Sequence, residues 1–118
     1  MITFDLSVRF SDTEPFPADY VQTLDWERTG TKILAVSKTV GTTAITISLA
    51  DLTQPGYAFF KNMSSQGNID VGYNDGSQRS LIRLAPGQFA LCPLKPGITL
   101  GAQADQAGCV LLAVVYEA

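Results

Sequence analysis

The sequence predicts an all-β fold: a single jelly-roll-like β-sandwich of about eight to ten short antiparallel strands, with little helix. Runs of alternating apolar and polar residues recur along the chain, and turn signals separate them about every ten residues. No segment sustains the 3.6-residue apolar period of an amphipathic helix. Because 118 residues are enough for one hydrophobic core and too few for two, we expect one domain spanning residues 1–118.

The N-terminal run alternates without a fault and predicts a half-buried strand. Its apolar face carries Ile2, Phe4, Leu6, Val8 and Phe10. The next segment, Ser11 to Asp19, contains Pro15 and Pro17, which lack the backbone donor that a strand ladder needs. We therefore expect an irregular loop or an arm at 11–19, followed by a strand over Tyr20 to Trp26.

Two β-branched-rich runs follow, Ile33 to Val40 and Ala44 to Leu49. The residues between them are Gly41, Thr42 and Thr43, which suit a short turn. The pattern predicts a hairpin whose second strand directs Ile45, Ile47 and Leu49 inward.

The stretch from Gly56 to Tyr73 is the most diagnostic part of the chain and predicts two strands around a polar turn. Alternation places Tyr57, Phe59 and Lys61 on one side of the first strand and Ala58, Phe60 and Asn62 on the other. Ile69, Val71 and Tyr73 share a face of the second strand.

Pro-Gly pairs separate predicted strands in the second half of the chain. Leu-x-Pro-Gly begins at Leu84 and again at Leu94, and Gln54 to Tyr57 contains a third Pro-Gly. Proline fixes the first corner of a type II turn and glycine supplies the positive φ of the second, so each pair should precede a strand.

The last run, Cys109 to Tyr116, is apolar on both of its faces. An edge strand of this composition would invite aggregation. We expect a central strand that is covered on both sides within the chain or capped by a neighbouring subunit.

Composition argues against several functional classes. The net charge is −3 and the eight basic residues are scattered, which argues against a nucleic-acid groove. With no histidine and no CxxC pair, we expect no enzyme, no metal site and no cofactor. No secretion signal and no run long enough to cross a bilayer is visible, so we expect no membrane partner. Cys92 and Cys109 lie in apolar surroundings and should be buried free thiols, as suits a protein made in a reducing cytosol.

Two alternatives rest on carboxylates and on aromatics. Asp70 with Asp75, or Asp25 with Glu27, could form the acid pair of a glycosidase, and Asp70, Asn74 and Asp75 could hold calcium. Turn formation and solvation explain these acids better. The candidate ligand-platform aromatics for stacking on sugars are Trp26, Tyr57 and Tyr73, together with Tyr20, although such residues more often serve a core or an interface.

Four segments together resemble a group of small structural proteins of tailed-bacteriophage virions. They are Gly56 to Asn62, Asn68 to Tyr73, Leu84 to Leu91 and Leu100 to Asp105, within a resemblance that covers roughly residues 56–116. Proteins of this kind are compact β-sandwich modules that decorate or cement a capsid, or that occur in neck, tail and fibre parts. The matching motifs are structural, and no functional residue is carried over from the resemblance.

The resemblance implies a capsid decoration or cement protein on the virion surface, assembled in the bacterial host cytoplasm. Its partners would be the major capsid protein and copies of itself, with a trimer as the expected oligomer. The alternative is a neck, tail or fibre module with a receptor- or carbohydrate-binding role. The candidate contacts lie in the N-terminal strand and the following loop, with turn tips at Gly67 and Gly76 as second candidates. These first candidates are Phe4, Asp12, Glu14, Phe16 and Asp19.

Overall fold

The computed structural model describes residues 2–9, 19–26 and 29–118 of the chain, and within the first two ranges the side chains of Thr3, Asp5, Ser7, Thr23, Asp25 and Trp26. These residues form ten strands. They are β1 (Ile2–Arg9), β2 (Asp19–Trp26), β3 (Ile33–Val40), β4 (Ile45–Ile47), β5 (Pro55–Asn62), β6 (Ile69–Asn74), β7 (Gln78–Leu84), β8 (Phe89–Pro93), β9 (Leu100–Ala104) and β10 (Cys109–Glu117).

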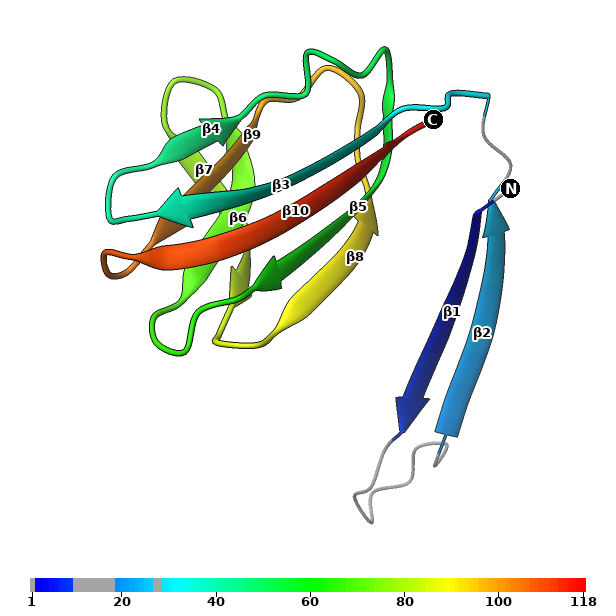
Figure 1. Ribbon diagram of the computed structural model, residues 1–118, viewed down its shortest axis with the longest axis horizontal. Coiled ribbons are helices and arrows are strands. Elements are labelled where there is room, and N and C mark those ends of the chain that lie inside the picture. The colour runs from blue at the N-terminus through cyan, green and yellow to red at the C-terminus, as the bar shows by residue number, and fades with distance from the viewer. Residues whose placement is uncertain (1, 10–18, 27–28) are drawn as a thin grey trace.

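Eight of the strands form two packed antiparallel sheets, in the orders β3-β10-β5-β8 and β4-β9-β6-β7 (Figure 1). The chain passes from one sheet to the other at every connection after β3 except β6 to β7, which pair with each other. This interleaved order is that of a jelly roll. The predicted all-β sandwich with little helix is confirmed.

The predicted hairpin over residues 33–49 is wrong. β3 pairs with β10 and β4 pairs with β9, so the two runs lie in opposite sheets. Val40 and Ile47 are both almost fully buried. The link across residues 41–44 thus lets two apolar faces meet across the core, where a hairpin would have set the strands side by side.

The core lies between the sheets and is built from the inward-facing residues of the alternating strands. Its largest fully buried side chains are Phe60, Ile47, Ile69, Leu100 and Leu111. In β5, Ala58, Phe60 and Asn62 are buried and the residues between them are not, as the alternation predicts. β10 is central, between β3 and β5, as expected for its composition.

Two of the three Pro-Gly turns form as predicted. Gly87 and Gly97 have φ values of +79° and +83°, the conformation that favours glycine. At the first turn the Gln88 amide donates to the Ala85 carbonyl over 2.9 Å. The third pair differs, since Pro55 and Gly56 are the first residues of β5 itself.

Asn62 is a fully buried polar side chain at the end of β5. Its Nδ2 donates to the carbonyls of Gly67 and Leu84, both at 2.9 Å, and its Oδ1 accepts from the Ser64 amide. Buried backbone groups left without such partners are costly, so Asn62 fixes the turn after β5 against the end of β7.

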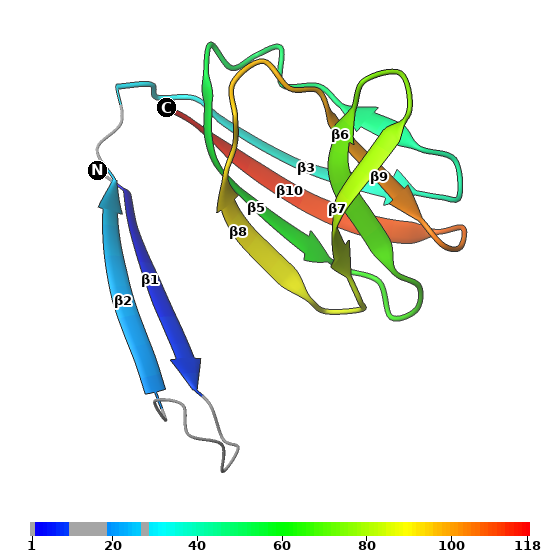
Figure 2. The same cartoon turned by 180° about the vertical axis from the view of Figure 1, so that it is seen from behind.

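β1 and β2 form a separate antiparallel hairpin, which we call the arm. Its register pairs Ile2 with Trp26 and continues to Arg9 opposite Asp19. In Figure 1, and from behind in Figure 2, the arm stands apart from the two sheets and joins them beside the C-terminus. The two predicted N-terminal strands therefore exist, but they pair with each other and not with the sandwich.

Candidate interaction surface

The outer face of the β3-β10-β5-β8 sheet carries mostly apolar side chains. We call this set the outer face; it consists of Ile33, Ala35, Ser37, Thr39, Tyr57, Phe59, Lys61, Phe89, Leu91, Pro93, Val110, Leu112, Val114 and Tyr116. Three of these residues, Ser37, Thr39 and Lys61, are polar or charged. A sandwich sheet that faces water normally alternates apolar inward with polar outward. β10 breaks that rule, because its outward residues are as apolar as its inward ones.

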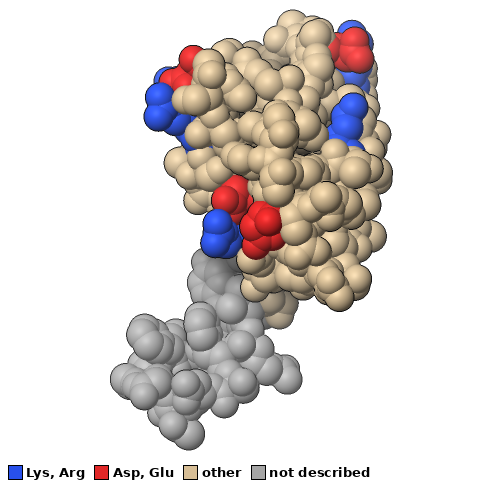
Figure 3. Space-filling view, turned by 90° about the vertical axis from the view of Figure 1, so that its left-hand side faces the viewer, with Lys and Arg blue, Asp and Glu red and all other residues tan. Residues whose placement is uncertain are grey.

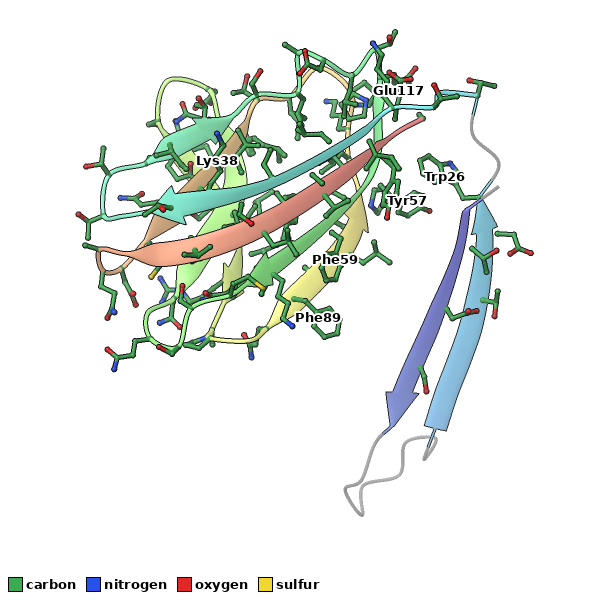
Figure 4. All side chains as sticks on the ribbon, in the orientation of Figure 1. Trp26, Lys38, Tyr57, Phe59, Phe89 and Glu117 are labelled. Carbon is green, nitrogen blue, oxygen red and sulfur yellow. The ribbon has the colours of Figure 1, made fainter. Side chains whose placement is uncertain are left out.

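The apolar part of the outer face is exposed at the β8 side. Phe89 is 65% exposed and Leu91 is 42% exposed. The Phe59 and Phe89 rings stack with centroids 5.9 Å apart (Figure 4). Leu91 is the cross-strand partner of Phe59. Contiguous exposed apolar surface of this kind marks a contact with another surface.

The arm has a polar face whose described side chains are exposed, and two pairs of them are hydrogen-bonded across the strands. Thr3 donates to Asp25 and Thr23 donates to Asp5, each over 2.9 Å. Since alternate residues of a strand lie on opposite faces, the register places the apolar residues of β1 in rows on the other face of the arm. In β2 the same rows hold Tyr20, Leu24 and Trp26, with the polar Gln22 opposite Leu6. The arm is therefore amphipathic.

Trp26 anchors the root of the arm on the outer face. Its ring meets Tyr57 edge-on, with centroids 4.9 Å apart and planes at 69° (Figure 4). A Cβ at position 56 would collide with the Trp26 ring and lie 3.0 Å from the Tyr116 carbonyl oxygen. Glycine is required here because the indole lies directly against the backbone of β5.

The junction between arm and sandwich is held on its other side by Glu117. This carboxylate is buried and accepts from the Thr53 amide at 2.8 Å and from the Thr31 amide at 3.2 Å. The Gly30 amide donates to the Ala118 carbonyl, and Gly30 packs against the Glu117 side chain. The hydrogen bond from Thr53 is the main cause that lowers the pKa of Glu117, with Lys32 and Thr31 contributing.

The predicted contact residues fall mainly where side chains are not described. Phe4 lies in β1 opposite Leu24, and Asp19 begins β2 opposite Arg9, but the structure describes only their backbone. Asp12, Glu14 and Phe16 lie outside the described residues. Of the two turn tips, Gly76 is exposed, whereas a side chain at Gly67 would run into Cys109 and Gln106.

The carboxylates weighed for catalysis or calcium are held in local contacts. Asp70 accepts two hydrogen bonds from Arg83, at 2.8 and 3.1 Å, and Asp75 accepts from Arg79 at 3.2 Å. Asn74 accepts from the Gly76 amide within its own turn. Asp25 is engaged with Thr3, and Glu27 lies outside the described residues.

The proposed platform aromatics do not gather at one place. Trp26 and Tyr57 meet at the junction, whereas Tyr73 lies on β6 of the opposite sheet. Tyr73 borders a mainly apolar pocket of about 530 Å³ between the edges of the sheets, with Leu81, Leu94 and Ile98.

Both cysteines are free thiols. Cys109 is buried, and its Sγ donates to the carbonyls of Gln66 and Gln106. Cys92 is half-buried, and burial raises the pKa of its thiol.

Charges are sparse on the surface seen in Figure 3, where basic and acidic side chains occur mostly in small mixed groups. In the part of the chain that the structure describes, no three acidic, cysteine or histidine side chains come together as a metal site. The same residues contain no helix with the length and apolarity to span a membrane.

Comparison with known proteins supports the fold. No protein-family model and no curated protein matches the chain. Among solved structures, it is similar to one of Bacillus endospore appendages, which form a family of disulfide-linked pili. The likeness has a TM-score of 0.53 at 18% identity and covers 80% of this chain and 96% of that one. At this identity the comparison establishes a shared β-sandwich architecture.

Gly56→Ala should displace the Trp26 ring, because the added methyl group occupies its position. Trp26 is the one tryptophan of the chain, so its fluorescence emission reports the change directly and should shift to longer wavelength. Gly41→Ala is the matched control, since a Cβ there meets nothing within 4 Å. Unchanged emission in Gly56→Ala would show that Trp26 does not sit on β5.

Glu117→Gln should lower the free energy of unfolding at neutral pH and flatten its dependence on pH. The folded state lowers the pKa of Glu117, so its stabilisation is complete above the ordinary value of about 4.5 and is lost as the pH falls below it. Urea unfolding of both proteins between pH 7 and about pH 3 measures the difference. Asp51→Asn, which removes an exposed carboxylate, is the control. Superimposable curves for wild type and Glu117→Gln would contradict this role.

Proposed function

We propose that the protein is a structural subunit of a tailed-bacteriophage virion, acting as a capsid decoration or cement protein. The observation that carries the proposal is the pairing, in one small chain, of an amphipathic arm with a sandwich whose outer face is apolar and is exposed at its β8 side. Each surface needs a cover that the sandwich does not supply. The choice of a tailed-bacteriophage virion as the particle comes from the sequence resemblance.

Three further observations support a structural role. Three of the motifs behind the resemblance have structural roles: Asn62 fixes a turn, and the Asn68 backbone and side chain both donate to Asp105 at 2.9 Å. Of the acids weighed for catalysis, Asp70 and Asp75 are engaged with arginines and Asp25 is engaged with Thr3. A similar sandwich occurs in pili, which are also assembled from repeated subunits.

A cement protein stabilises a capsid through the total area of its contacts with the shell. It bridges neighbouring subunits of the major capsid protein, and many weak contacts on one shell act together. Such work requires rigid modules and exposed contact surfaces, and it requires no catalytic group. The jelly roll supplies the rigid module, and the arm and outer face supply the surfaces.

The neck, tail or fibre alternative has one observation in its favour. Trp26 and Tyr57 place two aromatic rings together at the junction, where a sugar ring could stack. In that role the protein would bind a receptor or carbohydrate.

The purified protein should co-sediment saturably with undecorated capsids of the source phage and raise their melting temperature. The physical reason is that contacts bridging capsid subunits oppose their separation. Copy number at saturation, measured against the major capsid protein, should match a symmetry of the shell. Capsids that neither bind the protein nor gain stability would contradict the cement role. Glycan binding that is lost in Trp26→Ala would then favour the fibre alternative.

A further inference from the structure

The arm and the outer face match in length and in chemistry. The arm's strands have eight residues each, as does β3, while β10 has nine. At about 3.4 Å per residue each of these elements is roughly 27–30 Å long. The apolar rows of the arm could therefore lie along the full length of the sheet as a third layer.

The junction holds the arm away from its own sheet. Trp26 rests on Gly56 and Tyr57, and Gly30 is bonded to the C-terminal residue, so only three residues separate two anchored points. Immediately after Gly30, the Glu117 carboxylate accepts hydrogen bonds from the amides of both Thr31 and Thr53. In both ribbon views the arm consequently diverges from the sandwich that carries it.

Three of the four sheet edges, β3, β4 and β8, are poorly suited to pairing with another chain, and two of them bound the sheet that carries the outer face, which favours contact through that face. β4 has only three residues, and β8 is short and ends at Pro93. On β3, Lys38 lies opposite the buried Leu111, on the inward-facing row of the edge strand, yet is exposed (Figure 4). Inward-pointing lysines, prolines and short strands at edges all oppose strand addition.

We propose that the outer face receives the arm of a second copy of this chain. The apolar rows of the arm, on the face opposite Thr3 and Asp25, cover Phe59, Phe89 and Leu91 of the neighbouring sandwich. This deepens the proposed function, because it assigns the contact by which the structural subunits bind one another.

The area of such an exchange is sufficient for a specific contact. Two strands spaced about 4.8 Å apart give the arm a face of roughly 27 by 10 Å. In a reciprocal exchange two arms and two sheets are covered, which buries roughly 1,100 Å² in total, near the lower end of specific interfaces. In a closed ring each further subunit adds the same contact.

Isotope-coded cross-linking tests the contact. The double variant Phe4→Cys with Leu91→Cys carries one thiol in the arm's apolar rows and one on the outer face. Heavy-labelled and unlabelled preparations are mixed in urea, refolded together and treated with a short bismaleimide. Mass spectrometry then identifies the cross-linked peptide pairs that join positions 4 and 91. About half of these pairs should be mixed, with one heavy and one unlabelled peptide, because arms are exchanged at random between copies.

The matched control is Thr3→Cys with Leu91→Cys, which moves the arm thiol to the exposed polar face. It should give several-fold less cross-linking. Pairs of a single isotope only would mean that each arm folds onto its own sheet, and this would overturn the proposal. Equal yields from positions 3 and 4, or no pair at all, would also overturn it.

The outcome is separable from that of the proposed function. Capsid binding without mixed-isotope pairs would rule out the arm exchange and would still support the cement role. Mixed-isotope pairs in a protein that does not bind capsids would support the arm exchange and rule out the cement role.

Discussion

The composition of β10 is the constraint on which the rest of the structure depends. Its inward residues Leu111, Ala113 and Val115 are fully buried between the sheets, whereas Val110, Leu112 and Val114 face outward and are just as apolar. A strand of this kind must be central in its sheet, and the jelly-roll order places it between β3 and β5. The core of the sandwich covers one of its two faces. The other requires a cover from outside the sandwich, and the proposed arm exchange supplies one.

The end of the same strand also fixes where the arm leaves. Glu117 follows the last apolar pair of β10 and accepts from the backbone before β3 and before β5. Tyr116 contributes its carbonyl to the crowded position at Gly56, where the Trp26 ring lies. The C-terminal segment thus contributes both to the core and to the junction from which the arm leaves. A rigid junction would allow many identical copies to present their arms in the same direction.

Local patterns predicted most of the strands, because period-two alternation and turn chemistry act over a few residues. β3 has the predicted bounds, Ala58, Phe60 and Asn62 are buried as expected, and Gly87 and Gly97 occupy turns with positive φ. Strand partners were harder to predict. Residues 33–49 look like a hairpin because a short link can join neighbours in a sheet or cross between sheets, and the choice depends on β9 and β10, far along the chain.

The candidate surface was only partly visible in the sequence. The all-apolar β10 indicated a covered strand, and the alternation of residues 2–10 indicated an apolar face, but no local signal shows that β1 pairs with β2 outside the sandwich. Phe59, Phe89 and Leu91 come from strands that the sequence predicts separately, and only the register of β5 with β8 brings them together. Glu117 carries no sequence signal at all, since its role depends on two loops 64 and 86 residues away.

The mass of the intact protein in solution, measured by light scattering for wild type, Leu91→Asp and Leu81→Asp, tests the central claim most directly. The account predicts a wild-type mass that is a multiple of the chain's and a monomer for Leu91→Asp, whose charge would be buried under a neighbouring arm. Leu81→Asp, at a 75% exposed position on β7 of the opposite sheet, should keep the wild-type mass. A wild-type monomer at all concentrations, or a Leu91→Asp protein that is as large as wild type, would contradict the account.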